Sequence, residues 1–229
     1  FGEQQIIITN ANNVASVYAT DLDNDGDVDV LSAFSGGNRI TWYENDGSGN
    51  FGRSQLITTA ADGASSIYTA DLDNDGDIDV VSASRKDDKV AWYENDGSGN
   101  FGEQQIITTN AEEARSVYAA DLDNDEDIDI LSASSADNKI AWYENDGSGN
   151  FGEQQIITTA TDYANDVYAV DLDNDGDIDV LSASWSDDKI AWYENDGSGN
   201  FGEQQVITTN ADGANSVYAA DLDNDGDID

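Results

Sequence analysis

Short hydrophobic runs separated by polar turns recur along the whole chain. In the first unit, β-branched or aromatic runs occupy 17–20, 28–34 and 39–44, and a fourth run follows at 54–59. Glycine-rich and aspartate-rich segments separate these runs, and helix signals are lacking. The pattern predicts four consecutive β-strands.

The pattern returns every fifty residues. The sequence Asp-Leu-Asp-Asn-Asp-Gly-Asp-Val-Asp at 21–29 recurs in register at 71, 121, 171 and 221. A period of this length is typical of repeat architectures, and a four-strand unit of about 40–50 residues has the size of a β-propeller blade. We therefore expect an all-β fold and a single repeat domain over 1–229, a β-propeller of four-stranded blades. The expected blades cover about 15–58, 65–108, 115–158 and 165–208, with partial pieces at 1–9 and 215–229.

Two features favour a propeller over a sandwich. The first strand carries small residues, Ala19 and Thr20, as a strand crowded near an axis requires. The third strand is apolar on both faces, with Ile40 and Trp42 on one face and Tyr43 on the other. A sheet covered on both sides by neighbours shows this pattern. We interpret the recurring tryptophans as packing between blades.

The aspartate run suits a calcium ion. Calcium takes six to eight oxygen ligands, and a tight loop supplies them from alternate positions. Asp21, Asp23 and Asp25 point inward in such a loop, Asp27 offers its backbone carbonyl, and Asp29 adds a further carboxylate. Magnesium is less suitable because it requires strict octahedral geometry. An EF-hand is excluded because the flanks are β-rich, and the remaining alternative is a solvated acidic turn.

One Ca²⁺ ion is expected in each loop, up to five in the chain. Gly26 occupies the sharpest bend, where we expect a positive φ. Glu126 replaces this glycine in the third loop, so that loop is expected to bind more weakly. The expected ligand sets are Asp21, Asp23, Asp25, Asp27 and Asp29; Asp71, Asp73, Asp75, Asp77 and Asp79; Asp121, Asp123, Asp125, Asp127 and Asp129; Asp171, Asp173, Asp175, Asp177 and Asp179; and Asp221, Asp223, Asp225, Asp227 and Asp229.

Composition restricts the partners. The chain has 49 acidic and 8 basic residues and a formal net charge of −41. This charge excludes nucleic acid, since phosphate binding requires basic surface. No apolar run approaches the roughly 20 residues needed to span a bilayer, so we expect no membrane insertion. Millimolar calcium occurs outside cells, which favours an extracellular or cell-surface location. Methionine is absent and both ends fall part-way through a unit, so we expect a window of a larger propeller or array.

The repeats resemble the calcium-binding propeller repeat of integrin α-subunits, known as the FG-GAP or VCBS repeat. The match lies in Asp-x-Asp-x-Asp-Gly-x-x-Asp after the first strand and in Asn-Asp-Gly-Ser-Gly-Asn-Phe-Gly between the third and fourth strands. It covers essentially the whole chain, and Glu126 is its main departure. The resemblance implies seven or eight blades, calcium in the loop after the first strand, and roles in adhesion, sugar binding or scaffolding. Some members of the family cleave polysaccharides.

The repeats differ mainly in two segments, 10–16 and 34–38, and in their counterparts. In an up-and-down blade these segments lie on one rim, and the invariant loops lie on the rim that carries the calcium sites. Loops on a rigid scaffold often carry binding residues, although neutral drift explains the same variation. The candidate ligand residues on the variable rim are Phe34, Arg85, Lys86, Arg115, Tyr163 and Trp185.

Catalysis has little support in the sequence. Histidine and cysteine are absent, and the recurring acids belong to the metal loops. We expect a non-enzymatic extracellular calcium-binding protein, a structural or adhesion module of a cell surface or appendage. Its partners would be other copies of itself, other surface proteins or glycans, and strand pieces at 4–9 and 216–220 would pair between copies. The alternative is a carbohydrate-binding lectin with sites between blades or on the variable rim.

Overall fold

The structure is a computed structural model that describes residues 4–9, 11 and 13–229. Strands, turns and loops make up these residues, and no helix among them is long and apolar enough to span a bilayer. The strands are β1 (Val14–Thr20), β2 (Asp29–Phe34), β3 (Arg39–Tyr43), β4 (Gln55–Thr58), β5 (Ala64–Ala70), β6 (Asp79–Ser84), β7 (Lys89–Tyr93), β8 (Gln105–Thr108), β9 (Ala114–Ala120), β10 (Asp129–Ser134), β11 (Lys139–Tyr143), β12 (Gln155–Thr158), β13 (Ala164–Val170), β14 (Asp179–Ser184), β15 (Lys189–Tyr193) and β16 (Gln205–Thr208).

These strands form four antiparallel sheets of four strands each, in the order in which they occur along the chain. In the first sheet, Leu31 of β2 lies opposite both Tyr18 of β1 and Trp42 of β3. The same register recurs in the other three sheets. The predictions of an all-β fold and of a four-stranded repeating unit are confirmed.

The hydrophobic core lies between consecutive sheets. Ile40 and Trp42 of the first repeat share one buried cluster with Ile67, Val80 and Tyr93 of the second. Two further clusters join the second repeat to the third and the third to the fourth in the same way. The second and third sheets are therefore covered on both faces, which explains why their third strands are apolar throughout. The packing role expected for the tryptophans is confirmed in the first three repeats.

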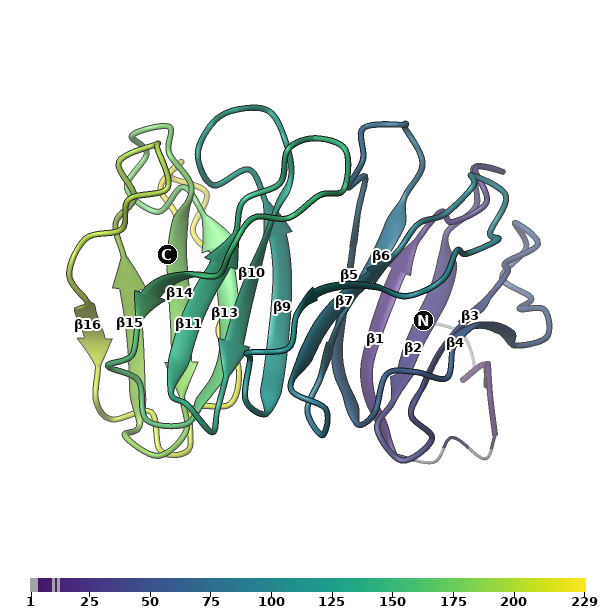
Figure 1. Ribbon diagram of the computed structural model, residues 1–229, viewed down its shortest axis with the longest axis horizontal. Helices are drawn as coiled ribbons and strands as arrows, with labels where there is room; N and C mark the ends of the chain where they lie inside the picture. Colours follow the sequence, from purple (N-terminus) through teal and green to yellow (C-terminus); the bar gives the residue numbers. More distant parts are fainter. Residues whose placement is uncertain (1–3, 10, 12) are drawn as a thin grey trace.

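The first strand of each repeat lies innermost. β5 contacts β1 on one side and β9 on the other, and β9 contacts β13. Figure 1 shows the four sheets following one another, with loops gathered at the upper and lower ends of the strands. The inner strands and the segment 217–218 line one cavity of about 570 Å³. Side chains from five repeats converge there.

A row of tyrosines follows the inner strands. Successive ring centroids are 4.9, 4.4, 5.0 and 4.8 Å apart. Aromatic pairs at such distances are attractive beyond the area that they bury. The row consists of Tyr18, Tyr68, Tyr118, Tyr168 and Tyr218.

Each sheet pairs only its own four strands, so no sheet among the described residues closes on itself, and a closed propeller is not shown. The strands expected in the partial pieces 1–9 and 215–229 are also absent from 4–9 and 215–229; residues 1–3 lie outside the described part. In the second piece a single backbone bond of the strand type is present, from the N–H of Asp229 to the carbonyl of Ala220 at 3.0 Å. The segment 214–220 nevertheless lies beside β13, where Asn165 donates its side-chain amide to the carbonyl of Asn215 at 2.9 Å.

The loops lie on two rims, as predicted. We call the loops 21–28 and 44–54 and their counterparts the aspartate rim, which is at the top of Figure 1. Here the backbone N–H of Asn45 donates to Asp29 at 2.8 Å. The variable rim lies at the other end, where the N–H of Arg85 donates to the carbonyl of Gly63 at 3.2 Å.

Candidate metal sites and the variable rim

Each aspartate loop is folded by bonds to its own carboxylates. Asn24 and Gly26 have φ values of 59° and 92°, so the positive φ expected at the glycine is confirmed. The N–H of Gly26 donates to Asp21 Oδ2 at 2.9 Å, and that of Asp27 donates to Asp25 Oδ1 at 2.8 Å. The sharp turn thereby brings alternate carboxylates to one side of the loop.

The structure brings carboxylates together in all five loops. In each of the first three repeats, ligand oxygens of the first, second and fifth aspartates lie within 4.8 Å of one another. In the last two repeats the third aspartate takes the place of the fifth. The clusters are Asp21, Asp23 and Asp29; Asp71, Asp73 and Asp79; Asp121, Asp123 and Asp129; Asp171, Asp173 and Asp175; and Asp221, Asp223 and Asp225.

Several of these oxygens fit a cation. The Oδ1 atoms of Asp21, Asp23, Asp71, Asp73 and Asp123 are buried and have no hydrogen-bond partner among the described residues. Moving a carboxylate oxygen from water to a buried position without a hydrogen-bond partner costs roughly several kcal/mol of free energy. Oxygen donors of this kind are the ligands that Ca²⁺ prefers. The donor set therefore suits a hard divalent cation.

The electrostatics of the loops point the same way. Burial raises the pKa of Asp79 and Asp129 to about 7 and that of Asp179 to about 6. Burial also raises the pKa of Asp73, and repulsion by Asp75 adds to this increase. The ionised forms are thus unfavourable without positive charge nearby. A bound cation would stabilise them.

The fifth aspartate has a structural role that the sequence did not reveal. Asp29 is fully buried, and its two oxygens accept the N–H groups of Leu22 (3.0 Å) and Asn45 (2.8 Å). It therefore ties the aspartate loop to the β3–β4 loop of the same repeat. Asp79, Asp129 and Asp179 make the same pair of bonds.

The fourth aspartate lies outside every cluster. Its side chain accepts a bond from the asparagine of the preceding loop: Asn24 Nδ2 donates to Asp77 Oδ1 at 2.7 Å. Asn74 donates to Asp127 at the same distance. No role was predicted for Asn24, so this link was missed. The sequence signal for this link is the recurrence of the asparagine at the same position in every repeat.

A second asparagine also joins neighbouring repeats. Asn95 Nδ2 donates to the carbonyl of Leu22 in the previous repeat at 2.8 Å and to that of Ile78 in its own repeat at 2.9 Å. The turn glycine Gly99 packs against Trp42, because a Cβ there would lie 2.3 Å from the indole ring. The invariant turn therefore belongs to the interface between repeats.

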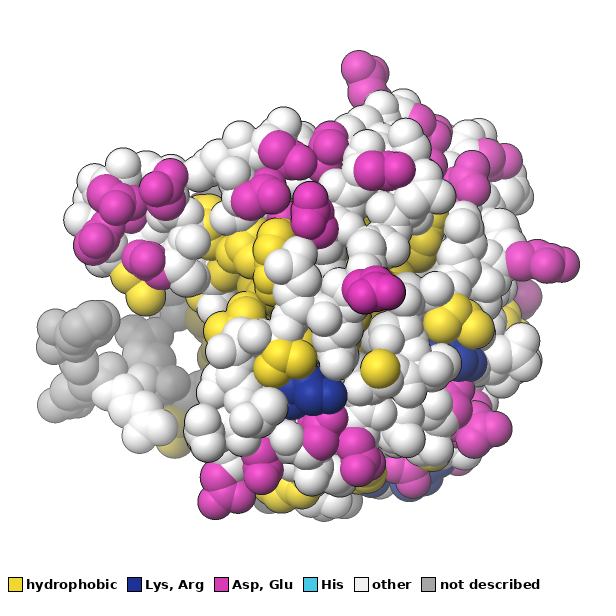
Figure 2. Space-filling view, turned by 90° about the vertical axis from the view of Figure 1, so that its left-hand side faces the viewer, with side chains coloured by type: hydrophobic (Ala, Val, Ile, Leu, Met, Phe, Trp, Pro, Cys, Tyr) yellow, Lys and Arg dark blue, Asp and Glu magenta, His cyan; other side chains and the backbone are white. Residues whose placement is uncertain are grey.

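Acidic side chains outnumber basic ones on the surface. Figure 2 shows the C-terminal end of the molecule, where Asp and Glu side chains lie at both the upper and the lower end and Lys and Arg appear in only a few places. The aspartate rim at the upper end is therefore negative, and cations are attracted to it.

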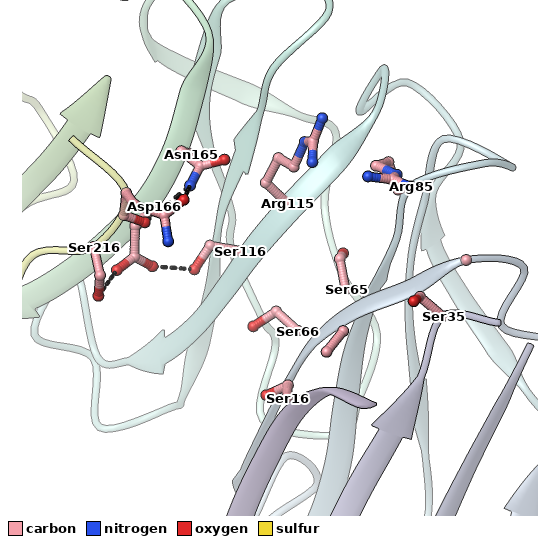
Figure 3. A pocket seen from close by; sticks show the side chains of 13 residues that line it. Ser16, Ser35, Ser65, Ser66, Arg85, Arg115, Ser116, Asn165, Asp166 and Ser216 are labelled. Carbon is pink, nitrogen blue, oxygen red and sulfur yellow. Dashed lines mark hydrogen bonds between the residues drawn. The ribbon is translucent and has the colours of Figure 1, made fainter. Parts of the chain in front are cut away.

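The variable rim contains a polar cavity of about 450 Å³ between the inner strands. Figure 3 shows Arg85 and Arg115 on one side of it and Asp166 on the other, with several serines between them. Two of the six candidate ligand residues, Arg85 and Arg115, line this cavity. Tyr163 lies beside it and stacks with the guanidinium of Arg115, 4.8 Å from the ring centroid.

The other three candidates lie elsewhere. Lys86 is exposed and pairs with Asp62 at 3.3 Å. Trp185 is 49% exposed and lies over Gly213 of the following repeat. The proposal of Phe34 as a ligand residue was wrong, because its side chain is fully buried and the Arg39 guanidinium covers its ring at 4.5 Å.

The repeats match a known family. A model of the FG-GAP-like repeat matches residues 21–82, 71–132, 121–182 and 171–229. The chain belongs to the FG-GAP-like repeat family. The FG-GAP-like repeats identified in this way cover both the aspartate loops and the strands around them. No curated protein matches the chain.

Solved structures share the fold at low sequence identity. A lectin of Agrocybe aegerita that recognises non-reducing terminal N-acetylglucosamine is 20% identical, with a TM-score of 0.62 over 85% of this chain and 52% of the lectin. The V. cholerae biofilm matrix protein Bap1 is 21% identical, with a TM-score of 0.55 over 90% of this chain and 30% of Bap1. An auxiliary nutrient binding protein of Bacteroides ovatus is 12% identical, with a TM-score of 0.59 over 93% of this chain and 55% of the nutrient binding protein. The FG-GAP-like chain thus spans about half the length of the lectin and less of Bap1.

Proposed function

We propose that this FG-GAP-like chain is a non-enzymatic, calcium-stabilised binding module that acts outside cells in adhesion or matrix structure. The repeats form one domain whose blades cover about 15–58, 65–108, 115–158 and 165–208, arranged around the tyrosine-lined axis as in a propeller. The biofilm matrix protein among the structural neighbours supports the setting.

One observation carries the proposal. Buried carboxylate oxygens with no hydrogen-bond partner among the described residues recur at equivalent positions, for example in Asp23, Asp73 and Asp123. Each Ca²⁺ ion would be held by the first, second, third and fifth aspartates of a loop and by the backbone carbonyl of the fourth. The ion would offset part of the negative charge of the loop and fix the loop against the next repeat, because the asparagine link starts from the same loop.

Calcium should therefore stabilise the fold. A ligand that binds only the folded state adds RT ln(1 + [L]/Kd) for each site. Thermal melts in millimolar Ca²⁺ and after exhaustive EGTA treatment test this expectation, and calorimetric titration counts the sites. Asp73→Asn should remove one site from the count, whereas Asp212→Asn, at an exposed aspartate outside the clusters, should remove none. An unchanged melting temperature after EGTA would refute the proposal.

A lectin is the second candidate, and the variable rim favours it. A polar cavity lined from several repeats suits a ligand with many hydroxyl groups, and one structural neighbour is a lectin. A glycan array probed in calcium separates the two candidates. Reproducible binding to one glycan class supports the lectin, and an array without binding supports a purely structural module.

A further inference from the structure

The polar cavity on the variable rim has an uneven distribution of charge. Its lining includes the equivalent serines Ser16, Ser66 and Ser116, while Asp166 occupies the same position in the fourth repeat. Arg85 contributes from the loop after β6 (Figure 3). The cavity therefore contains both hydroxyl groups and charged groups within about 450 Å³.

The single carboxylate in this lining is already satisfied. Asp166 Oδ1 accepts the hydroxyl of Ser116 at 2.7 Å, and Oδ2 accepts the hydroxyl of Ser216 at 2.7 Å and the N–H of Val217 at 3.0 Å. Hydrogen bonds from three groups therefore already occupy its two oxygens. Asp166 thus holds the inner strands together and has little remaining capacity for a ligand.

Arg115 is also engaged within the protein. Its guanidinium pairs with Glu113 at 2.9 Å, donates to Ser135 Oγ at 2.9 Å and donates to the hydroxyl of Tyr163. The positive charge of Arg115 is therefore largely compensated.

Arg85 differs from Arg115 in this respect. Its backbone N–H is fixed by the carbonyl of Gly63, but its guanidinium makes no ion pair or hydrogen bond within the described residues. The chain carries a net charge of −41 and only 8 basic residues. Arg85 is half-buried and, like Arg39, has no carboxylate partner within the described residues, but Arg39 covers the ring of Phe34 whereas Arg85 lines the cavity. Its position at the cavity makes it available to an external anion.

The serines supply complementary hydrogen bonds. Ser16 Oγ accepts the N–H of Ile67 at 3.4 Å, and Ser66 Oγ accepts the N–H of Val117 at 3.4 Å. Neither hydroxyl proton has an acceptor among the described residues. Both hydroxyl groups can therefore donate to a ligand in the cavity.

We propose that this cavity binds an acidic saccharide, with the sugar carboxylate paired to Arg85 and sugar hydroxyls bonded to Ser16 and Ser66. The guanidinium fork matches a carboxylate in two parallel hydrogen bonds. A volume of about 450 Å³ accommodates a small ligand. This inference rests on the proposed binding role of the module and assigns the ligand class to one site.

Calorimetric titration of the full chain in calcium tests the assignment with glucuronate, glucose and inorganic sulfate as probes. Glucuronate should bind more tightly than either glucose or sulfate, since it alone offers both a carboxylate and hydroxyl groups. Equal binding of glucose would overturn the role of the carboxylate. Equal binding of sulfate would overturn the role of the saccharide, and absence of glucuronate binding would overturn the assignment as a whole.

Variants at neighbouring residues locate the site. Arg85→Gln should weaken glucuronate binding about tenfold to hundredfold, the range for a lost hydrogen bond to a charged group. Arg85→Lys should retain part of the affinity because it keeps the charge but loses the fork. Lys86→Gln is the matched control and should leave binding unchanged, because Lys86 is exposed and pairs with Asp62. Unchanged binding by Arg85→Gln would refute the site.

Melting curves of the same variants separate this inference from the proposed function. Arg85→Gln should keep the full increase in melting temperature on addition of calcium. Loss of glucuronate binding with an intact calcium response supports the cavity site. An absent calcium response in the unaltered chain refutes the calcium proposal and leaves the titration result standing.

Discussion

The side-chain amide of Asn24 reaches the carboxylate of Asp77, 2.7 Å away in the next repeat. The same asparagine has a positive φ of 59°, which asparagine adopts more readily than most residues. A single residue thus shapes the aspartate loop and links it to its neighbour. Similar bonds follow at Asn74, Asn124 and Asn174.

Removing one such link should destabilise the array. Asn74→Ala deletes the bond to Asp127 and should lower the free energy of unfolding by about 1 kcal/mol beyond the backbone cost. Asn224→Ala is the matched control, because Asn224 has a φ of 62° and no side-chain bond to another repeat within the described residues. Urea unfolding in calcium measures the difference. Equal losses in the two variants would show that the link contributes nothing.

The turn glycines allow a second matched comparison. A Cβ at Gly99 would lie 2.3 Å from Trp42, whereas the nearest atom to a Cβ at Gly49 is 3.9 Å away. The φ values are similar, 70° and 78°, so the backbone cost is shared. Gly99→Ala should therefore destabilise the protein by about 1–3 kcal/mol more than Gly49→Ala, the usual cost of overpacking. Equal unfolding midpoints would contradict the packing role of this turn.

The third loop should gain stability from a glycine. Glu126 has a φ of 75°, while Gly76 at the equivalent position has a φ of 93° and open space around its Cβ position. Glu126→Gly should raise the free energy of unfolding by about 1–2 kcal/mol, because the left-handed conformation no longer strains a side chain. It should also strengthen calcium binding at Asp121 and Asp123. Gly76→Glu should produce the opposite change, and a neutral result in both variants would contradict the argument.

The tyrosine row predicts sensitivity to alkali. Burial raises the pKa of Tyr18 to about 12, and a hydrogen bond with the Tyr68 side chain adds to this increase. Burial also raises the pKa of Tyr68 to about 12. The ordinary value for both groups is 10.0. At a pH between 10.0 and about 12, these two tyrosines have lost their protons in the unfolded chain but retain them in the folded chain. The free energy of unfolding should therefore be independent of these groups below pH 10.0 and should fall as the pH rises toward 12.

Unfolding by urea at about pH 9 and about pH 11.5 measures this fall, and tyrosinate absorbance follows the ionisation. The double variant Tyr18→Phe, Tyr68→Phe is the control and should show a smaller fall over the same interval. An equally large fall in the double variant would assign alkaline unfolding to other groups.

Much of the fold followed from local pattern. Alternating and apolar runs predicted the four-stranded unit, since strand formation and burial depend on neighbouring residues within one repeat. The convergence of Asp21 and Asp23 was predictable for the same reason. Comparison of the repeats also distinguished the rim with invariant loops from the rim with variable loops.

Contacts between repeats could not be predicted in this way. Asn24 bonds to a carboxylate 53 positions later, and a loop considered alone does not reveal that acceptor. Asp29 was expected only as a ligand, because its two backbone donors come from separate loops. Phe34 was expected on the surface because it borders a variable loop, yet it pairs with Arg39 across the sheet and its ring is covered. The pieces 4–9 and 215–229 have strand-like sequences but form no strand in the part of the chain that the structure describes, although 214–220 lies beside β13.

The bond that Asn95 makes to the preceding repeat has a consequence for the evolution of such chains. Asn95, Asn145 and Asn195 each hold the carbonyl of a leucine in the preceding repeat with the same geometry. For these invariant contacts, any repeat can therefore follow any other without a new contact having to arise. An in-frame duplication or deletion of one fifty-residue unit preserves this asparagine bond at every remaining junction. Genes of this kind can change length by unequal recombination while selection on each junction stays the same.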